Sequence, residues 1–149
     1  MVTRGKGGAM AVWHLGPFDN DDAVEWCGAL EASAPEQRTE YLRQALAAAA
    51  ARGPKPTAGE AARAVAAAAT ALQSLTGTPT SNSAYAPWFL GRGDIQVSPS
   101  LLDLAARALD VVLADGSAWR QRWAGDVEEE EALAVVEDLR RRLASATMP

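Results

Sequence analysis

The residues best suited to chemistry lie in one acidic stretch near the N-terminus, whose carboxylate and amide oxygens belong to Asp19, Asn20, Asp21, Asp22 and Glu25. Asp21, Asp22 and Glu25 could hold a Mg²⁺ ion together with waters, because Mg²⁺ needs few protein ligands. The stretch does not match a calcium-binding EF-hand loop, since Val24 stands at the glycine position and Leu30 at the position of the bidentate glutamate. We favour a second interpretation, in which Asp19 or Asn20 caps a helix and the following acids complement the helix dipole.

The chain has one histidine and one cysteine, which limits the reactions it could catalyse. His14 could act as a general base or hydrogen-bond a carbonyl in a turn, and we favour the structural role because no second histidine accompanies it. Cys27 is predicted on an apolar helix face, where a buried, unreactive thiol is more common than a nucleophile. A pair of Cys27 with His14 stays open, although no third group orients it. An internal disulfide bond and a zinc site built on several cysteines or histidines are excluded, and we expect no cofactor.

Aromatic residues are the other candidates for binding. Trp13 and Phe18 flank a predicted Gly-Pro turn ahead of the acidic stretch. Trp88 and Arg92 lie in residues 78–97, a long segment without helical periodicity, and such loops are often functional or disordered. Because tryptophan is enriched at protein interfaces, an exposed tryptophan would indicate a partner site. The candidate binding residues are therefore Trp13, His14, Phe18, Asp19, Asn20, Asp21, Asp22, Glu25, Trp88 and Arg92.

Helices must position these residues, and the first two are bounded by capping signals. The first is predicted to run to about Ala32, with an apolar face of Ala23, Trp26, Cys27 and Leu30. Ser33 and Glu36 have the spacing of a capping box, so we expect them to open a second helix that stops at Gly53-Pro54. One face of that helix carries Tyr41, Leu42, Ala45, Leu46 and Ala49.

Two further helices follow. Thr57 and Glu60 form another capping box, and the helix that they open is predicted to run to Gly77. Its apolar residues are Ala61, Val65, Ala68, Ala69, Leu72 and Leu75. Ser98 and Pro99 fit the N-cap and the first position of a fourth helix. The apolar residues of that helix recur every three or four positions, which predicts one buried face. They are Leu101, Leu104, Ala105, Ala108, Leu109 and Val112.

The C-terminal part is predicted to add two helices. Ser117 caps a short one in which Trp119 and Trp123 lie one turn apart, and we expect both to be core or interface residues rather than a stacking platform. The last helix begins in the acidic residues 128–131 and ends at the arginines of residues 140–142, a polarity that matches the helix dipole at both ends. Its apolar face is Ala132, Val135, Val136, Leu139 and Leu143.

These elements predict an all-α fold, because no segment alternates apolar and polar residues as a half-buried strand does. We expect a single-domain bundle of five to six helices with an irregular N-terminal arm and one long loop. Residues 1–9 are glycine-rich and lack periodicity, so they are predicted to form a flexible tail. Residues 10–146 are expected to form the single all-helical domain.

Length and charge restrict the class of function. The chain has 149 residues, enough for one domain, and its formal net charge is −5. This acidic balance argues against nucleic acid or an anionic membrane as the partner. The longest apolar runs are interrupted by polar residues, and the N-terminus lacks the apolar centre of a signal peptide, so we expect a cytoplasmic protein.

The start of the chain resembles a family whose members begin near Trp-Gly-x-Gly-x-Phe-x-Asn-Asp-x-Ala-x-Asp-Trp. The residues that fit this pattern are Trp13, Gly16, Phe18, Asn20, Asp21, Ala23 and Trp26. His14 replaces the first glycine and Glu25 the late aspartate, while the segment from Ser98 to Asp115, with Trp123, is similar to the family's C-terminal half. On these residues the chain resembles the bacterial family called domain of unknown function 4259. The resemblance implies no function, because the family has no assigned activity.

Two functions from different classes remain. We favour a small acidic binding protein without catalysis that acts by protein–protein contact, of an immunity or regulatory type. This expectation rests on the missing catalytic constellation, the acidic balance and the tryptophan content. The alternative is a carboxylate-based enzyme, such as a Mg²⁺-dependent hydrolase, that uses residues 19–22 with His14 nearby. In the first case the acids cap a helix or face a basic partner, and in the second they converge in a pocket with perturbed pKa values.

Overall fold

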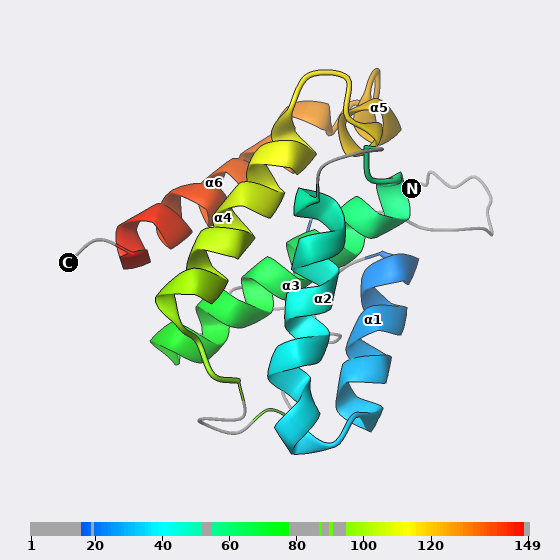
Figure 1. Cartoon of the computed structure of the whole chain (residues 1–149). Helices are drawn as coiled ribbons and strands as arrows, with labels where there is room; N and C mark the ends of the chain where they lie inside the picture. The colour runs from blue at the N-terminus through cyan, green and yellow to red at the C-terminus, as the bar shows by residue number, and fades with distance from the viewer. Residues whose placement is uncertain are drawn as a thin grey trace.

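The chain forms packed α-helices in a computed structural model that describes residues 16–18, 20–51, 55–77, 87, 90 and 95–147. Over these residues there are six α-helices, one short 3₁₀ helix and no β-strand (Figure 1), so the predicted all-α fold is confirmed. The helices are α1 (Asp21–Ala32), η1 (Pro35–Gln37), α2 (Arg38–Ala50), α3 (Ala58–Thr76), α4 (Pro99–Leu113), α5 (Ala118–Trp123) and α6 (Glu129–Thr147).

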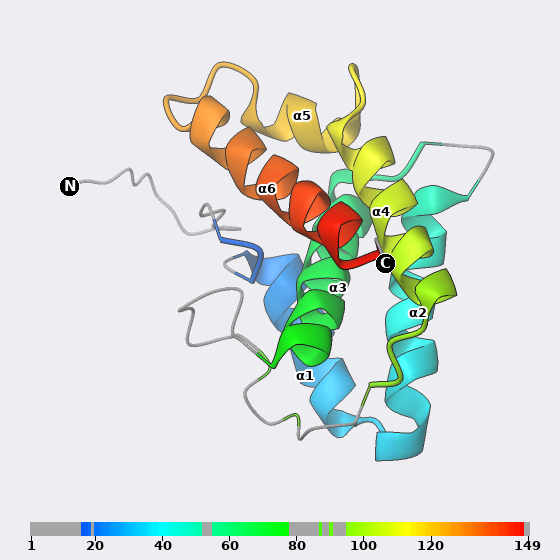
Figure 2. The same cartoon turned by 90° about the vertical axis from the view of Figure 1, so that its left-hand side faces the viewer.

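The central helix of the bundle is α3, which contacts each of the other five α-helices (Figures 1 and 2). From Ala61 to Leu72 every residue except Arg63 is buried, and most of them are alanines. Alanine side chains are small and lose no rotamer freedom on burial, so neighbouring helices can approach α3 from several sides. A helix that is apolar almost all round belongs in the middle of a fold, whereas the sequence predicts only one apolar face for it.

One hydrophobic core joins the helices, and the predicted inner faces of α1, α4 and α6 contribute to it. Trp119 and Trp123 are buried in this core, which confirms the prediction that they are not a stacking platform. Leu75 was predicted on the apolar face of α3 but is 42% exposed. It lies in the last turn of α3, beyond the buried segment that ends at Leu72 and next to the left-handed Gly77 that terminates the helix.

Two predicted boundaries around α2 are wrong. Ser33 ends α1 instead of capping α2, because its hydroxyl donates to the carbonyl of Ala29 at 2.9 Å and η1 intervenes before α2 begins. At its other end α2 stops at Ala50, before the predicted Gly53-Pro54 signal, with Ala51 in an extended conformation. The η1 turn, with Pro35 at its first position, separates Ser33 from the start of α2.

The predicted end of α6 is also wrong, since the helix continues past its arginines to Thr147. Arg140 reaches across to α4, where its Nε and Nη2 donate to the two carboxylate oxygens of Asp110 at 2.7 and 3.3 Å. Arg141 and Arg142 both pair with Asp138 on their own helix. Arg140 therefore joins α6 to α4, while Arg141 and Arg142 form ion pairs within α6. None of the three lies in the last turn of α6, where positive charge would complement the helix dipole.

Some predictions lie outside the described residues, namely the flexible tail of residues 1–9 and most of the loop at residues 78–97. Within the part of the chain that the structure describes, none of the helices is both long and apolar enough to cross a membrane.

Candidate functional site

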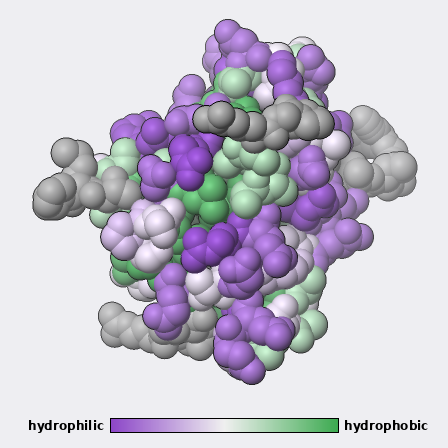
Figure 3. Space-filling model, viewed as in Figure 1, coloured by the Kyte–Doolittle hydropathy of each residue, from purple (hydrophilic) through white to green (hydrophobic). Residues whose placement is uncertain are grey.

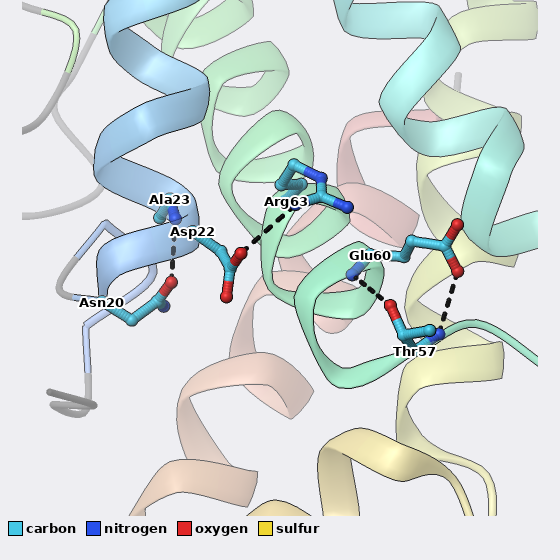
Figure 4. A network of polar contacts seen from close by, with 6 residues as sticks. All are labelled: Asn20, Asp22, Ala23, Thr57, Glu60 and Arg63. Carbon is cyan, nitrogen blue, oxygen red and sulfur yellow. Dashed lines mark hydrogen bonds and ion pairs between the residues drawn. The ribbon is translucent and has the colours of Figure 1, made fainter. Parts of the chain in front are cut away.

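The acidic stretch forms the start of α1. Asn20 is the N-cap, because its side-chain Oδ1 accepts a hydrogen bond from the backbone N–H of Ala23 at 2.8 Å (Figure 4). Its side chain is buried, and Asp21 and Asp22 follow in the first turn, where negative charge is favourable. The predicted helix cap is therefore confirmed, and Asn20 rather than Asp19 provides it.

Asp22 links α1 to α3. Its Oδ1 accepts a hydrogen bond from Nη1 of Arg63 at 3.2 Å, and both side chains are about one-third exposed (Figure 4). The two helices approach closely here, since a Cβ on Gly59 would lie only 3.1 Å from that same carboxylate oxygen. The Asp22 carboxylate thus already has a cation as its partner.

Asp21 and Glu25 lie on the exposed side of α1, and neither lines the hollow described below. In the described ranges, no group of three histidine, cysteine, aspartate or glutamate side chains could hold a metal ion. The structure therefore brings Asp22 and Arg63 together, leaves Asn20 as a helix cap, and leaves Asp21 and Glu25 exposed.

The other candidate residues divide into two groups. Phe18 has no exposed surface, so it is a core residue of the turn before α1 and is not available to a ligand. The remaining candidates, Trp13, His14, Asp19, Trp88 and Arg92, lie outside the described residues.

A hollow of about 210 Å³ lies between α1, α2 and α3, and we call it the Trp26 hollow. It arises because α1 packs mainly on α3 and touches α2 only slightly, which leaves a gap between α1 and α2. Trp26 of α1 and Tyr41 of α2 stack across this gap, with ring centroids 5.7 Å apart and planes inclined by 19°. The hollow is lined by Trp26, Tyr41, Gln44, Ala45, Ala48, Glu60 and Arg63.

The polar groups around the hollow are held by the fold. Arg63 is fixed by Asp22, and Glu60 caps α3 by accepting a hydrogen bond from the backbone N–H of Thr57 at 2.9 Å. Burial raises the pKa of the Tyr41 hydroxyl, and the nearby Arg63 charge opposes that rise. Trp26 is only 3% exposed, and its indole N–H has no hydrogen-bond partner among the residues described. The hollow thus combines a half-buried tyrosine and a fixed arginine over a buried tryptophan.

Cys27 follows Trp26 but is buried on the core side of α1. Burial raises the pKa of its thiol to about 12, so the thiolate that a nucleophile requires is suppressed at neutral pH. The interpretation of Cys27 as a buried thiol is confirmed.

Comparison with known families agrees with the resemblance seen in the sequence. The profile of a family described as a domain of unknown function, DUF4259, matches residues 11–138. The chain belongs to the DUF4259 family. No curated protein matches the chain, and no solved structure does so either.

Several of the residues that resemble the DUF4259 pattern have structural roles. Phe18 and Ala23 are core residues, and Asn20 caps α1. Trp26 differs from these, because it both packs in the core and lines the hollow.

None of the residues that line the Trp26 hollow in this DUF4259 protein was among the candidate binding residues from sequence. Tyr41, Gln44, Ala45 and Ala48 recur at the spacing of one helix stripe, which is a weak signal for a shared face. Whether these α2 residues lie beside Trp26 depends on the angle at which α1 and α2 pack on α3. Local sequence does not specify that angle.

Proposed function

We propose that this protein binds another protein and that a side chain of the partner enters the Trp26 hollow. The observation that carries the proposal is the hollow in which the half-buried Tyr41 stacks on the buried Trp26 beside Arg63. Tryptophan, tyrosine and arginine are enriched among binding hot spots at protein interfaces, and the lining of the hollow includes one of each.

The size of the hollow favours one side chain over a whole small molecule. Small-molecule sites usually have volumes of about 300–1,000 Å³, whereas a cavity of about 150 Å³ accepts a benzene ring. The hollow measures about 210 Å³ and is therefore close to the space that one large apolar side chain needs.

The surface next to the hollow would let a partner approach. Ala47, Ala48 and Ala51 are all exposed on α2 and at its end, and they project little from the helix. Figure 3 shows apolar surface reaching the exterior between hydrophilic side chains on the face seen in Figure 1. A binding protein of immunity or regulatory type acts by occupying its partner, so it needs no catalytic group of its own. The cytoplasmic location expected from the sequence stays a prediction.

Photo-cross-linking in cells of the source organism tests the proposal. A photoreactive amino acid at Ala48 is expected to capture one partner protein reproducibly. The same group at Glu137, which is exposed on α6, serves as the control because α6 contacts neither α1 nor α2. Equal capture from both positions, or no capture from Ala48, would contradict the proposal.

Divalent cations test the alternative of a carboxylate enzyme. A cation that binds only the folded protein raises the melting temperature by mass action. Because Asp22 pairs with Arg63 and the exposed acids do not converge, we expect Mg²⁺ to give no shift that depends on Asp21 or Glu25. A shift that disappears in the variant D21N/E25Q would favour the enzyme instead.

A further inference from the structure

We propose that the partner presents a cationic segment to the Trp26 hollow, in which lysines or arginines flank the apolar side chain that enters it. This inference rests on the proposed function, because it names the chemistry of the partner at the same hollow. It is argued from where the charge of the protein lies, and from which carboxylates have no cation among the described residues.

Two of the helices that form the hollow lie in an acidic segment of the chain. Residues 20–51, which contain α1, η1 and α2, hold six acids and two arginines, a net charge of −4, while the whole chain has −5. Residues 126–149, with seven acids and three arginines, have the same net charge of −4. The acidity next to the hollow is therefore shared with the α6 segment, and a segment of opposite charge is complementary to it.

The arginines near the hollow are already used by the fold. Arg38 donates to the carbonyls of Leu30 and Glu31 at the end of α1, at 3.2 and 3.0 Å. Arg43 pairs with Glu40 at 3.4 Å, and Arg63 pairs with Asp22. Their charges are thus directed to helix ends and neighbouring carboxylates, and not to the outer face of α1.

Asp21 and Glu25 are exposed acids on the outer face of α1, beside the hollow but outside its lining. An α-helix turns by about 100° per residue, so moving round α1 from Trp26 toward solvent gives Asp22, then Glu25 and then Asp21. Both Asp21 and Glu25 are exposed, and neither forms an ion pair with another described residue. Like charges one helical turn apart repel, and a cation from the partner between them would remove that repulsion.

Three labelled peptides of equal length test the inference by fluorescence anisotropy. The first has a central tryptophan flanked by lysines, the second replaces that tryptophan with alanine, and the third replaces the lysines with glutamates. We expect the first to bind at least about tenfold more tightly than either of the others. Its affinity should fall as the salt concentration rises, because salt screens exposed charges.

Two matched charge-reversal variants show which acids of the protein attract the first peptide. The variant D21K/E25K is expected to weaken the first peptide about tenfold. The variant E130K/E131K on α6 changes the net charge by the same amount, also near a helix start, and α6 does not contact α1 or α2. It should leave the affinity almost unchanged. Melting temperatures of both variants show whether they remain folded.

The outcomes separate the inference from the proposed function. Equal weakening by both charge reversals, equal binding of the acidic peptide, or a dissociation constant weaker than about 1 mM for the first peptide overturns the inference. If cross-linking at Ala48 still captures a partner protein, the proposed function stands without the cationic segment. If Ala48 captures nothing, the proposed function itself fails.

Discussion

At the residue scale, Phe18 fixes the turn that leads into α1. Its side chain is fully buried, so replacing it with alanine removes a large apolar contact and leaves a cavity. We expect Phe18→Ala to lower the free energy of unfolding by about 3–5 kcal/mol in urea denaturation. Leu75→Ala serves as the comparison. Because Leu75 is 42% exposed, its replacement should lower the free energy of unfolding much less. Similar losses from the two variants would show that Phe18 is not a core anchor.

Cys27 gives the protein a pH dependence in the alkaline range. Burial raises the pKa of its thiol from an ordinary value of 9.0 to about 12, so folding favours the neutral thiol. Its contribution is complete below pH 9.0 and is lost as the pH rises toward 12. We expect the free energy of unfolding to fall by about 1.4 kcal/mol per pH unit in that range, relative to Cys27→Ala. Tyr41 titrates in both proteins, so a parallel pH profile for the variant would contradict this role of Cys27.

Two helical glycines should respond differently to alanine, because only one of them faces a neighbour. A Cβ at Gly28 meets nothing within 4 Å, so Gly28→Ala should stabilise the protein by about 0.5–1 kcal/mol. A Cβ at Gly59 would lie 3.1 Å from the Asp22 carboxylate and press on its pair with Arg63. Gly59→Ala should therefore gain less than Gly28→Ala in thermal unfolding. Equal gains would show that α1 and α3 are not closely packed at Asp22.

At the scale of the elements, two segments with the same capping-box spacing behave differently. In residues 57–60 both reciprocal hydrogen bonds form, with Glu60 N–H donating to Thr57 Oγ1 at 3.0 Å and Thr57 N–H donating to Glu60 at 2.9 Å. In residues 33–36 the Ser33 hydroxyl bonds backwards to Ala29 instead. We expect Thr57→Ala to cost about 1 kcal/mol and Ser33→Ala to stay within about 0.5 kcal/mol of the parent. Chemical denaturation that gave the opposite order would contradict this assignment of the caps.

The elements also show what the sequence can predict. The inner faces of α1 and α4 follow from their apolar spacing, and the caps at Asn20, Ser98 and Ser117 follow from residue type and position. The central place of α3 does not follow from the sequence. An alanine-rich helix has the same sequence pattern whether other helices pack on one of its sides or on all of them. The Trp26 hollow does not follow either, since it depends on the angle between two helices that both pack on a third.

At the scale of the whole molecule, acidity and the aromatic hollow lie in the same region. The segment with α1 and α2, residues 20–51, has a net charge of −4 and also supplies Trp26 and Tyr41 to the hollow. Electrostatic attraction over this surface would speed the encounter with a cationic partner, and the apolar contact in the hollow would slow its release.

The most direct test of this account is the affinity of the cross-linked partner for two neighbouring variants of α2. Ala48 lines the hollow and Ala47 does not, yet both are exposed and glutamine is a good helix former at either position. We predict that Ala48→Gln raises the Kd at least about tenfold by filling the hollow, while Ala47→Gln leaves the Kd unchanged. Equal Kd values for the two variants would show that the partner does not use the Trp26 hollow.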